Sequence, residues 1–216
     1  MPKPFITENL FEVNEDKKIT VNEDHVIIDD YYKNYDDIVN FFEDTYVESW
    51  KMSDDSRNFI DYYDCRYGIA NWFPNQSLME NRLSVIHQMI HDFTGKTEIY
   101  IQKGLEFNVF KHRKENVSQK MQHHPHYDGG MYNYLTYIDP HCSGGTAIYE
   151  NVDVPNKESQ TLLVDISDYN LKHIIAAKPN RTVIFNGELL HAAYIEDNNV
   201  YYNNWRITQA NLVVCK

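Results

Sequence analysis

The stretch HYDGGMYNYLTYIDP, residues 126–140, gives the clearest indication of how this chain folds. Residues 132–137 are mostly aromatic or β-branched, which favours a pleated and half-buried strand. The pair Gly129-Gly130 before this run and Asp139-Pro140 after it are typical of turns. The stretch therefore predicts one short strand bounded by two turns.

The same pattern of short apolar runs and turn residues continues on both sides of this stretch. From residue 99 onward the predicted strands are 99–102, 105–110, 132–137, 146–149, 161–166, 182–185 and 205–214. Glycine, proline, asparagine and aspartate separate them at regular spacing, which is typical of a sandwich or jelly roll. We therefore expect a mainly β fold, a double-stranded β-helix of the jelly-roll or cupin-like type, with buttressing helices.

The N-terminal part has a different pattern and predicts the buttress. Residues 26–28 predict a strand, and Asn34 predicts the start of a helix whose apolar residues share one face. A second helix is expected from a capping box of Ser77 and Glu80 to Gly95. Residues 53–74 predict an irregular loop around Trp72, of the kind that often covers an active-site mouth. We expect one domain over 1–216, with the strand and helical buttress at 1–98 and the jelly-roll core at 99–216.

The composition excludes several classes of protein. Apolar residues make up 42% of the 216 residues and aromatic ones 14%, as in a globular domain. The formal net charge of −12 would repel a phosphate backbone, which argues against nucleic acid as a partner.

Cysteine usage and hydropathy predict the compartment. Cys65, Cys142 and Cys215 are odd in number and far apart, so they predict neither a disulfide framework nor a cysteine-based zinc site. The chain has no apolar run near the length that spans a bilayer, and its first residues lack the apolar core of a signal peptide. We expect a soluble cytoplasmic protein with no membrane partner.

Three residues have the chemistry of a metal site. On a strand His126 and Asp128 would point to one side and Tyr127 to the other, because side chains alternate. His191 follows on a later hydrophobic strand. Two imidazoles and one carboxylate can occupy one face of an octahedral iron(II) ion and leave three positions open. This residue set predicts an oxygenase.

The order of several further motifs carries a resemblance to a known family. The matching blocks are residues 107–110, 126–128, 135–139, 144–146, 179–185, His191 and 206–208. Over about 105–214 the chain resembles the iron(II)- and 2-oxoglutarate-dependent oxygenases, especially the prolyl-hydroxylase-like branch and its small members from bacteria and their viruses. The resemblance implies that His126, Asp128 and His191 bind iron.

The resemblance also implies a site for the co-substrate 2-oxoglutarate. Arg206 would pair with its distal carboxylate and Tyr137 would contact it. A planar guanidinium independently suits this role, since it stays charged and can bind a carboxylate through two hydrogen bonds. Thr208 has the same strand parity as Arg206, so its hydroxyl could donate to the same carboxylate. The polar residues 196–204 predict a hairpin loop that joins the strands of His191 and Arg206.

The activity implied by the resemblance is hydroxylation with release of succinate and carbon dioxide. Asp128 is present where related halogenases have a small residue, which favours hydroxylation. The related branch acts on protein side chains and free amino acids, so an amino-acid or peptide substrate is expected. The candidate substrate-pocket residues are Asn108, Gln122, His124 and Trp205.

Two other classes of protein remain open at this stage. His124, His126 and His191 could form the three-histidine site of a cupin metalloenzyme that does not use 2-oxoglutarate. Such a site would leave Asp128 and Arg206 without a role. A non-catalytic jelly-roll binding module would be expected to have lost a metal ligand, and this sequence retains all three.

Overall fold

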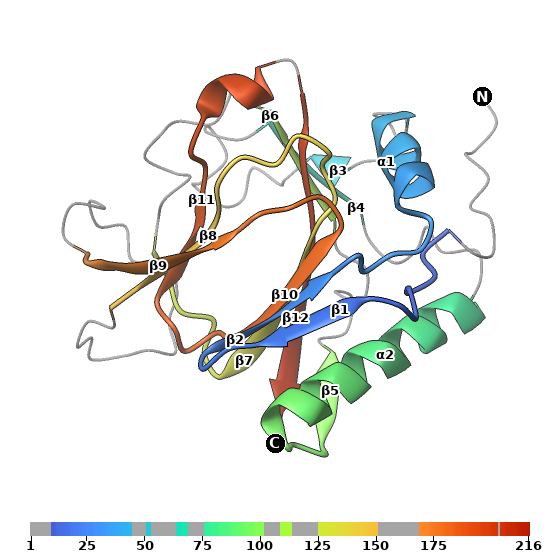
Figure 1. The fold of residues 1–216 in the computed structure, drawn as a ribbon, viewed down its shortest axis with the longest axis vertical. Coiled ribbons are helices and arrows are strands. Elements are labelled where there is room, and N and C mark those ends of the chain that lie inside the picture. The colour runs from blue at the N-terminus through green and yellow to red at the C-terminus, as the bar shows by residue number, and fades with distance from the viewer. Residues whose placement is uncertain are drawn as a thin grey trace.

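Antiparallel strands dominate the fold in the computed structural model, which describes residues 10–44, 51–52, 64–68, 76–101, 109–113, 125–150, 169–202 and 204–216 (Figure 1). The strands are β1 (Lys18–Val21), β2 (His25–Asp29), β3 (Lys51–Met52), β4 (Asp64–Gly68), β5 (Ile99–Ile101), β6 (Val109–Arg113), β7 (Met131–Tyr137), β8 (Gly145–Tyr149), β9 (Leu171–Ala176), β10 (Arg181–Asn186), β11 (His191–Tyr194) and β12 (Arg206–Cys215). The α-helices of the described ranges are α1 (Tyr35–Asp44) and α2 (Gln76–Thr94).

These strands form two antiparallel sheets. The larger has the order β1-β2-β10-β7-β12-β6-β4-β3, with β5 added to the end of β12. The smaller has the order β11-β8-β9. Sequence neighbours are rarely neighbours in a sheet, as in a jelly roll, where the chain crosses repeatedly between the two sheets. The mainly β prediction is confirmed.

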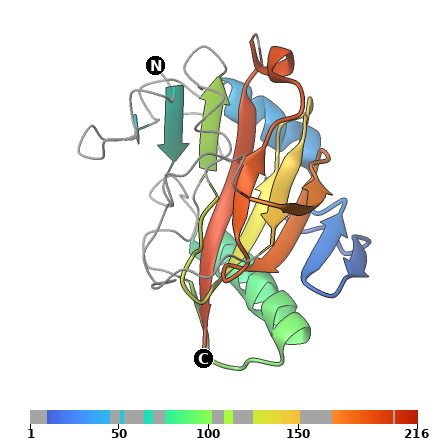
Figure 2. The same cartoon turned by 90° about the vertical axis from the view of Figure 1, so that its left-hand side faces the viewer.

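Alternating side chains of the large sheet pack in opposite directions. On β12, Ile207 and Val213 belong to a core cluster with Ile86 and Ile90 of α2. On β7 and β10 the intervening side chains form a second cluster with residues of the small sheet: Tyr137, Val183, Phe185, Ile148 and Ile175. The large sheet is therefore the middle layer, with the helices on one face and the small sheet on the other (Figure 2).

The two helices form where the sequence predicts them, with one difference. In α1 the amide of Ile38 donates to the carbonyl of Asn34, at 3.1 Å. α2 ends at Gly95, whose φ of 70° suits a helix C-terminus. α2 begins at Gln76, so Ser77 lies inside the helix and the prediction that it caps the helix is wrong. Both helices pack on the sheet, and their role as buttresses is confirmed.

Several strands were missed because they lack an alternating apolar face. All four residues of β1 are exposed at the edge of the large sheet, and β9 is mostly exposed at the edge of the small one. The strand β4 lies inside the segment predicted as an irregular loop, where it pairs with β6. The predicted strand at 161–166, and residues 105–108 of another, lie outside the described residues.

The connection between β11 and β12 differs from the predicted hairpin. β11 pairs with β8 in the small sheet, whereas β12 pairs with β6 and β7 in the large one. The connection therefore crosses between sheets, and it contains a 3₁₀ helix, Asn198–Tyr201, capped by the Asp197 side chain. The cap is a hydrogen bond of 2.8 Å from the Asn199 amide to the Asp197 carboxylate.

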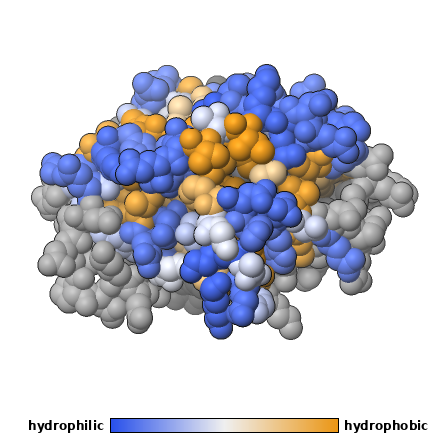
Figure 3. Space-filling model, turned by 60° about the horizontal axis from the view of Figure 1, so that its bottom comes forward, coloured by the Kyte–Doolittle hydropathy of each residue, from blue (hydrophilic) through white to orange (hydrophobic). Residues whose placement is uncertain are grey.

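The surface mixes charged residues with some exposed apolar ones. Figure 3 shows a group of hydrophobic residues surrounded by hydrophilic ones on one face. The most exposed large hydrophobic residue is Val21 of the edge strand β1, at 68%. No helix in the described ranges has both the length and the apolar character needed to cross a membrane.

Candidate metal and co-substrate site

His126, Asp128 and His191 meet between the two sheets. Their ligand atoms all lie within 4.8 Å of one another. Nε2 of His191 lies 3.2 Å from Oδ2 of Asp128, and Nε2 of His126 lies 3.8 Å from Oδ1 of the same carboxylate. The imidazole rings of His126 and His191 are 4.3 Å apart between centroids. Three donor atoms therefore converge on one point from two distant parts of the sequence.

Backbone hydrogen bonds hold the two segments in register. His126 and His191 form an isolated antiparallel bridge, in which each amide donates to the other's carbonyl at 2.9 and 3.1 Å. The amide of Asp128 donates to the carbonyl of Gly187 at 2.8 Å. Because the bridge pairs the two histidines directly, both imidazoles lie on the same side of it.

The turn around Gly187 fits closely against the carboxylate residue. A Cβ atom on Gly187 would lie 2.6 Å from the carbonyl oxygen of Met131 and 2.7 Å from Cβ of Asp128. Both distances are far below a normal contact, so only glycine allows this approach. The close packing fixes the backbone of Asp128.

Further hydrogen bonds orient the ligand side chains. Nδ1–H of His191 donates to the Leu189 carbonyl at 2.8 Å, which places a proton on Nδ1 and leaves Nε2 as the ring nitrogen that faces Asp128. The Asn133 amide donates to Oδ2 of Asp128 at 2.7 Å. The Phe185 ring packs edge-on against His191, with centroids 4.8 Å apart. These contacts are the kind that orients ligands in metal sites.

The electrostatics keep the carboxylate charged. Burial alone would raise the pKa of Asp128, but its hydrogen bond with His191, the charges of His191 and His126, and the Asn133 hydrogen bond together lower it to about 2. Asp128 is therefore ionised at neutral pH. An ionised carboxylate beside two imidazoles is a ready ligand set for a divalent cation.

Arg206 lies on the face of β12 that packs toward the small sheet. Side chains along β12 alternate between the two faces of the sheet, and that of Ile207 packs on the helix side. Arg206 is 9% exposed and forms no hydrogen bond or ion pair with any described residue. Its charge does reach Asp139: burial raises the pKa of that carboxyl and Arg206 partly opposes the rise. No described carboxylate forms an ion pair with the Arg206 guanidinium, which leaves it available to an anionic ligand.

Tyr137 and Thr208 lie side by side on the same inner face. They are directly paired between β7 and β12, and both are buried. The hydroxyls of Tyr137 and Thr146 are joined by a hydrogen bond of 2.8 Å, which connects the large sheet to β8 of the small one. Burial raises the pKa of Tyr137 to about 12, so this phenol is neutral.

Of the other predicted residues, Trp205 is the one that the structure describes, and it does not lie at this site. Trp205 packs against the helix-side core, on the face of the sheet opposite Arg206. The remaining predicted pocket residues and the loop around Trp72 lie outside the described residues: Asn108, Gln122 and His124. The three-histidine alternative depends on His124, and the group that the described residues assemble contains Asp128 instead.

Three contributors to the site have little or no signal in the sequence. Asn133 shares strand parity with Tyr137, which could have suggested an inward position. Gly187 resembles any other turn glycine in the sequence. The carbonyl of Leu189 acts through the backbone, so its identity gives no indication of its role.

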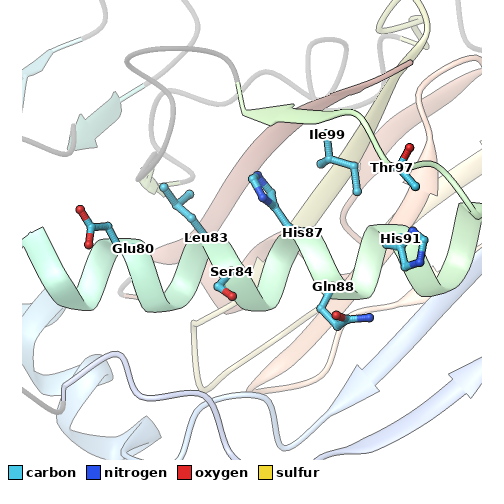
Figure 4. Close-up of a pocket in the computed structure, with 8 residues that line it drawn as sticks. All are labelled: Glu80, Leu83, Ser84, His87, Gln88, His91, Thr97 and Ile99. Atoms are coloured by element: carbon cyan, nitrogen blue, oxygen red, sulfur yellow. The ribbon is translucent and has the colours of Figure 1, made fainter.

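The structure also has a shallow groove of about 460 Å³ between α2 and β5, away from these residues. Leu83 and His87 line one side and Ile99 the other (Figure 4). None of the predicted site residues contributes to it. The groove therefore has no part in the metal and co-substrate site.

Comparison with known proteins gives only distant likenesses, all of them among solved structures. No protein-family model matches the sequence, and no curated protein matches it. A solved structure, that of AviO1 from Streptomyces viridochromogenes Tue57, aligns over 83% of this chain and 80% of its own, with a TM-score of 0.43 and 12% identity. The fold assignment rests on the strand order and the packing of the layers described above.

Proposed function

We propose that this protein is an iron(II)- and 2-oxoglutarate-dependent oxygenase that hydroxylates an amino-acid or peptide substrate. The observation that carries the proposal is the convergence of His126, Asp128 and His191, whose ligand atoms lie within 4.8 Å of one another. This donor set is the facial triad of non-haem iron(II) oxygenases. The resemblance of the sequence motifs to that family supports the same assignment.

The donor set fits iron(II) better than the alternatives. The described part of the site offers two imidazole nitrogens and carboxylate oxygen but no thiolate, so it does not suit an iron–sulfur site. His126 and His191 come from one β-bridge and Asp128 lies two residues after His126, so these residues would supply three ligands and leave three positions of a six-coordinate metal for other groups. Open positions are needed for a co-substrate and for dioxygen.

Arg206 supports 2-oxoglutarate as the co-substrate. A dicarboxylate that chelates the metal with one end has a second carboxylate to neutralise, and a buried guanidinium is the strongest partner for it. Among the described residues Arg206 has no bonded anion. Thr208 and Tyr137 line the same face and provide hydroxyl groups beside it.

The protein's own residues orient the metal and the co-substrate and exclude water. When bound, iron(II) and 2-oxoglutarate supply the activation of dioxygen, coupled to formation of succinate and carbon dioxide. Asp128 and His191 would hold the metal in a fixed orientation, since Asn133 and the Leu189 carbonyl fix their side chains. The apolar wall that includes Phe185 keeps the space between the sheets dry. Arg206 orients the co-substrate, and no residue needs to act as a general base.

The experiment is an anaerobic titration of the iron(II)-loaded protein with 2-oxoglutarate. We expect the weak visible charge-transfer band that bidentate chelation of iron(II) produces. The band should be lost in Asp128→Ala, which removes a ligand, and kept in Asp92→Ala, a control on the exposed surface of α2. Arg206→Met should keep iron bound and raise the 2-oxoglutarate concentration needed for the band.

The outcomes separate the competing functions. Iron binding without the band points to a metalloenzyme that does not use 2-oxoglutarate, and absence of metal binding points to a binding module. A second comparison tests whether Arg206 serves only to balance the charge of Asp139. In that case Asp139→Asn would restore the stability lost in Arg206→Met, and 2-oxoglutarate affinity would be the same in wild type and the double variant.

A further inference from the structure

We propose that Asp24, His25 and His173 form a second divalent-metal site, of the zinc class, which joins the tip of the β1–β2 hairpin to β9. Asp24 and His25 lie at the turn of the hairpin, at the edge of the large sheet (Figure 2). His173 lies on the outer strand of the small sheet. One ligand atom from each residue lies within 4.8 Å of the other two.

The distances suit a tetrahedral cation. Oδ1 of Asp24 lies 2.7 Å from Nδ1 of His25 and 3.7 Å from Nε2 of His173. Zinc holds nitrogen and oxygen ligands at about 2.0–2.2 Å, so neighbouring ligand atoms lie about 3.3–3.5 Å apart. The two observed distances fall on either side of this range. Small shifts of the side chains would bring both of these pairs of donors into this range.

A nitrogen atom without a partner points into this cluster. Nε2 of His173 is buried and has no hydrogen-bond partner. It faces the carboxylate of Asp24 from 3.7 Å, which is too far for a hydrogen bond. Leaving a buried polar atom unsatisfied destabilises the fold. A cation between His173 and Asp24 would remove this cost, because it accepts the lone pair of Nε2.

The second carboxylate oxygen and the second histidine already have partners that suit a metal site. Lys172 donates to Oδ2 of Asp24 at 2.9 Å and leaves Oδ1 for the cation. Asn22 lies 3.1 Å from Nε2 of His25 through its amide nitrogen. If Nδ1 of His25 binds a metal, its proton moves to Nε2, and a rotated Asn22 amide presents its oxygen to that proton. Asn22 can therefore serve both forms of His25.

The location of the site indicates a role in stabilising the fold. His25 and His173 rings lie 5.4 Å apart and are tilted by only 31°. They belong to different sheets, β2 in the large one and β9 in the small one. A metal at this position would close the edge between the sheets, and its binding energy would add to the stability of the folded chain.

The experiment uses the full chain with the interior site removed by Asp128→Ala and His191→Ala. In this background we expect one Co²⁺ per chain with the strong visible absorption of tetrahedral coordination, displaced by Zn²⁺. Adding His173→Gln should weaken Zn²⁺ binding at least about 100-fold, and adding Asp24→Asn about 10-fold. The matched control is His87→Gln on α2, which should change nothing.

Two results would overturn the proposal. One is a double variant that binds no Co²⁺ although circular dichroism shows it folded. The other is equal Zn²⁺ affinity in His173→Gln and His87→Gln. Because the interior ligands are absent throughout, neither result depends on whether the protein uses iron or 2-oxoglutarate.

Discussion

The chain gathers two histidines and one aspartate at two places, and the two clusters differ in how they are held. The interior cluster of His126, Asp128 and His191 is fixed by a backbone bridge and by the Asp128 amide bonded to Gly187. In the cluster at the rim, His25 and His173 are paired within strands of different sheets, and the contacts described between the hairpin and β9 are made by side chains. A backbone bridge therefore joins the two segments of the interior cluster, whereas side chains join those of the rim cluster.

The charges around the two clusters differ in the same way. The Asp128 carboxylate is bonded to a neutral amide and to histidine, with no lysine or arginine among its described partners. Asp24 is paired with Lys172, which neutralises it in the absence of a metal. An unneutralised, fixed triad attracts a cation strongly and leaves positions open for chemistry. A neutralised triad that spans the edges of two sheets suits a site that stabilises the fold.

The largest expected effect comes from changing the two aspartates in the same way. Asp128→Asn should weaken iron(II) binding at the interior site at least about 100-fold, because it removes the only negative ligand. Asp24→Asn should leave iron(II) affinity there unchanged. Equilibrium dialysis against iron(II) under anaerobic conditions measures both. Equal loss in the two variants would mean that the clusters are not independent.

A smaller effect is expected from the residue that orients the interior carboxylate. Asn133→Ala removes the hydrogen bond to Oδ2 of Asp128 and should weaken iron(II) binding about 10–100-fold. Asn170→Ala, an exposed asparagine beside the small sheet, is the control and should have no effect. Unchanged affinity in Asn133→Ala would show that the bridge and Gly187 are sufficient to orient Asp128.

The close packing at Gly187 predicts a loss of stability. Gly187→Ala places a Cβ against the Met131 carbonyl and Asp128, so the turn must move, at a cost of about 1–3 kcal/mol in the free energy of unfolding. Chemical denaturation measures this cost. The control is Gly130→Ala, where φ is +75° but the nearest contact is 3.8 Å away, at the Glu188 side chain. If Gly130→Ala costs as much as Gly187→Ala, backbone strain and not close packing dominates this turn.

Local patterns in the sequence predicted the central parts of the fold and the candidate site. Strand alternation placed Tyr127 away from His126 and Asp128, and in the structure Tyr127 is buried in a separate cluster with Tyr149 and Leu190. The strands β7, β10 and β12 were predicted because buried strands carry continuous apolar and aromatic residues. The end of α2 was predictable from Gly95 alone, because glycine readily adopts the left-handed conformation that ends a helix.

Features that depend on tertiary contacts were not predictable in this way. Lys172 and Asp24 are 148 residues apart, and nothing local relates the hairpin to β9. The edge strands β1 and β9 have too little apolar character to be distinguished from loops. The 196–204 connection was predicted as a hairpin because loop composition does not reveal which sheet the next strand joins.

The smallest expected effect concerns Asp29, a carboxylate on β2. Like Asp24 it is paired with a basic side chain, but its pair includes no histidine. Asp29 accepts hydrogen bonds from Nε and Nη2 of Arg181 at 2.7 and 3.0 Å. The Arg181 hydrogen bond lowers the pKa of Asp29 from its ordinary value of 3.8, despite partial burial. The pair therefore contributes stability above pH 3.8 that is lost as the pH falls through the lowered pKa of the folded state. Asp29→Asn should cost no more than about 1 kcal/mol at pH 7, because the pair is screened by solvent, and the cost should shrink toward pH 3. Denaturation of both proteins at pH 7, 5 and 3 measures this difference. If the cost stays constant with pH, the contribution of Asp29 comes from hydrogen-bond geometry and not from its charge. Charge balance would then no longer be the feature that distinguishes Asp29 from Asp128.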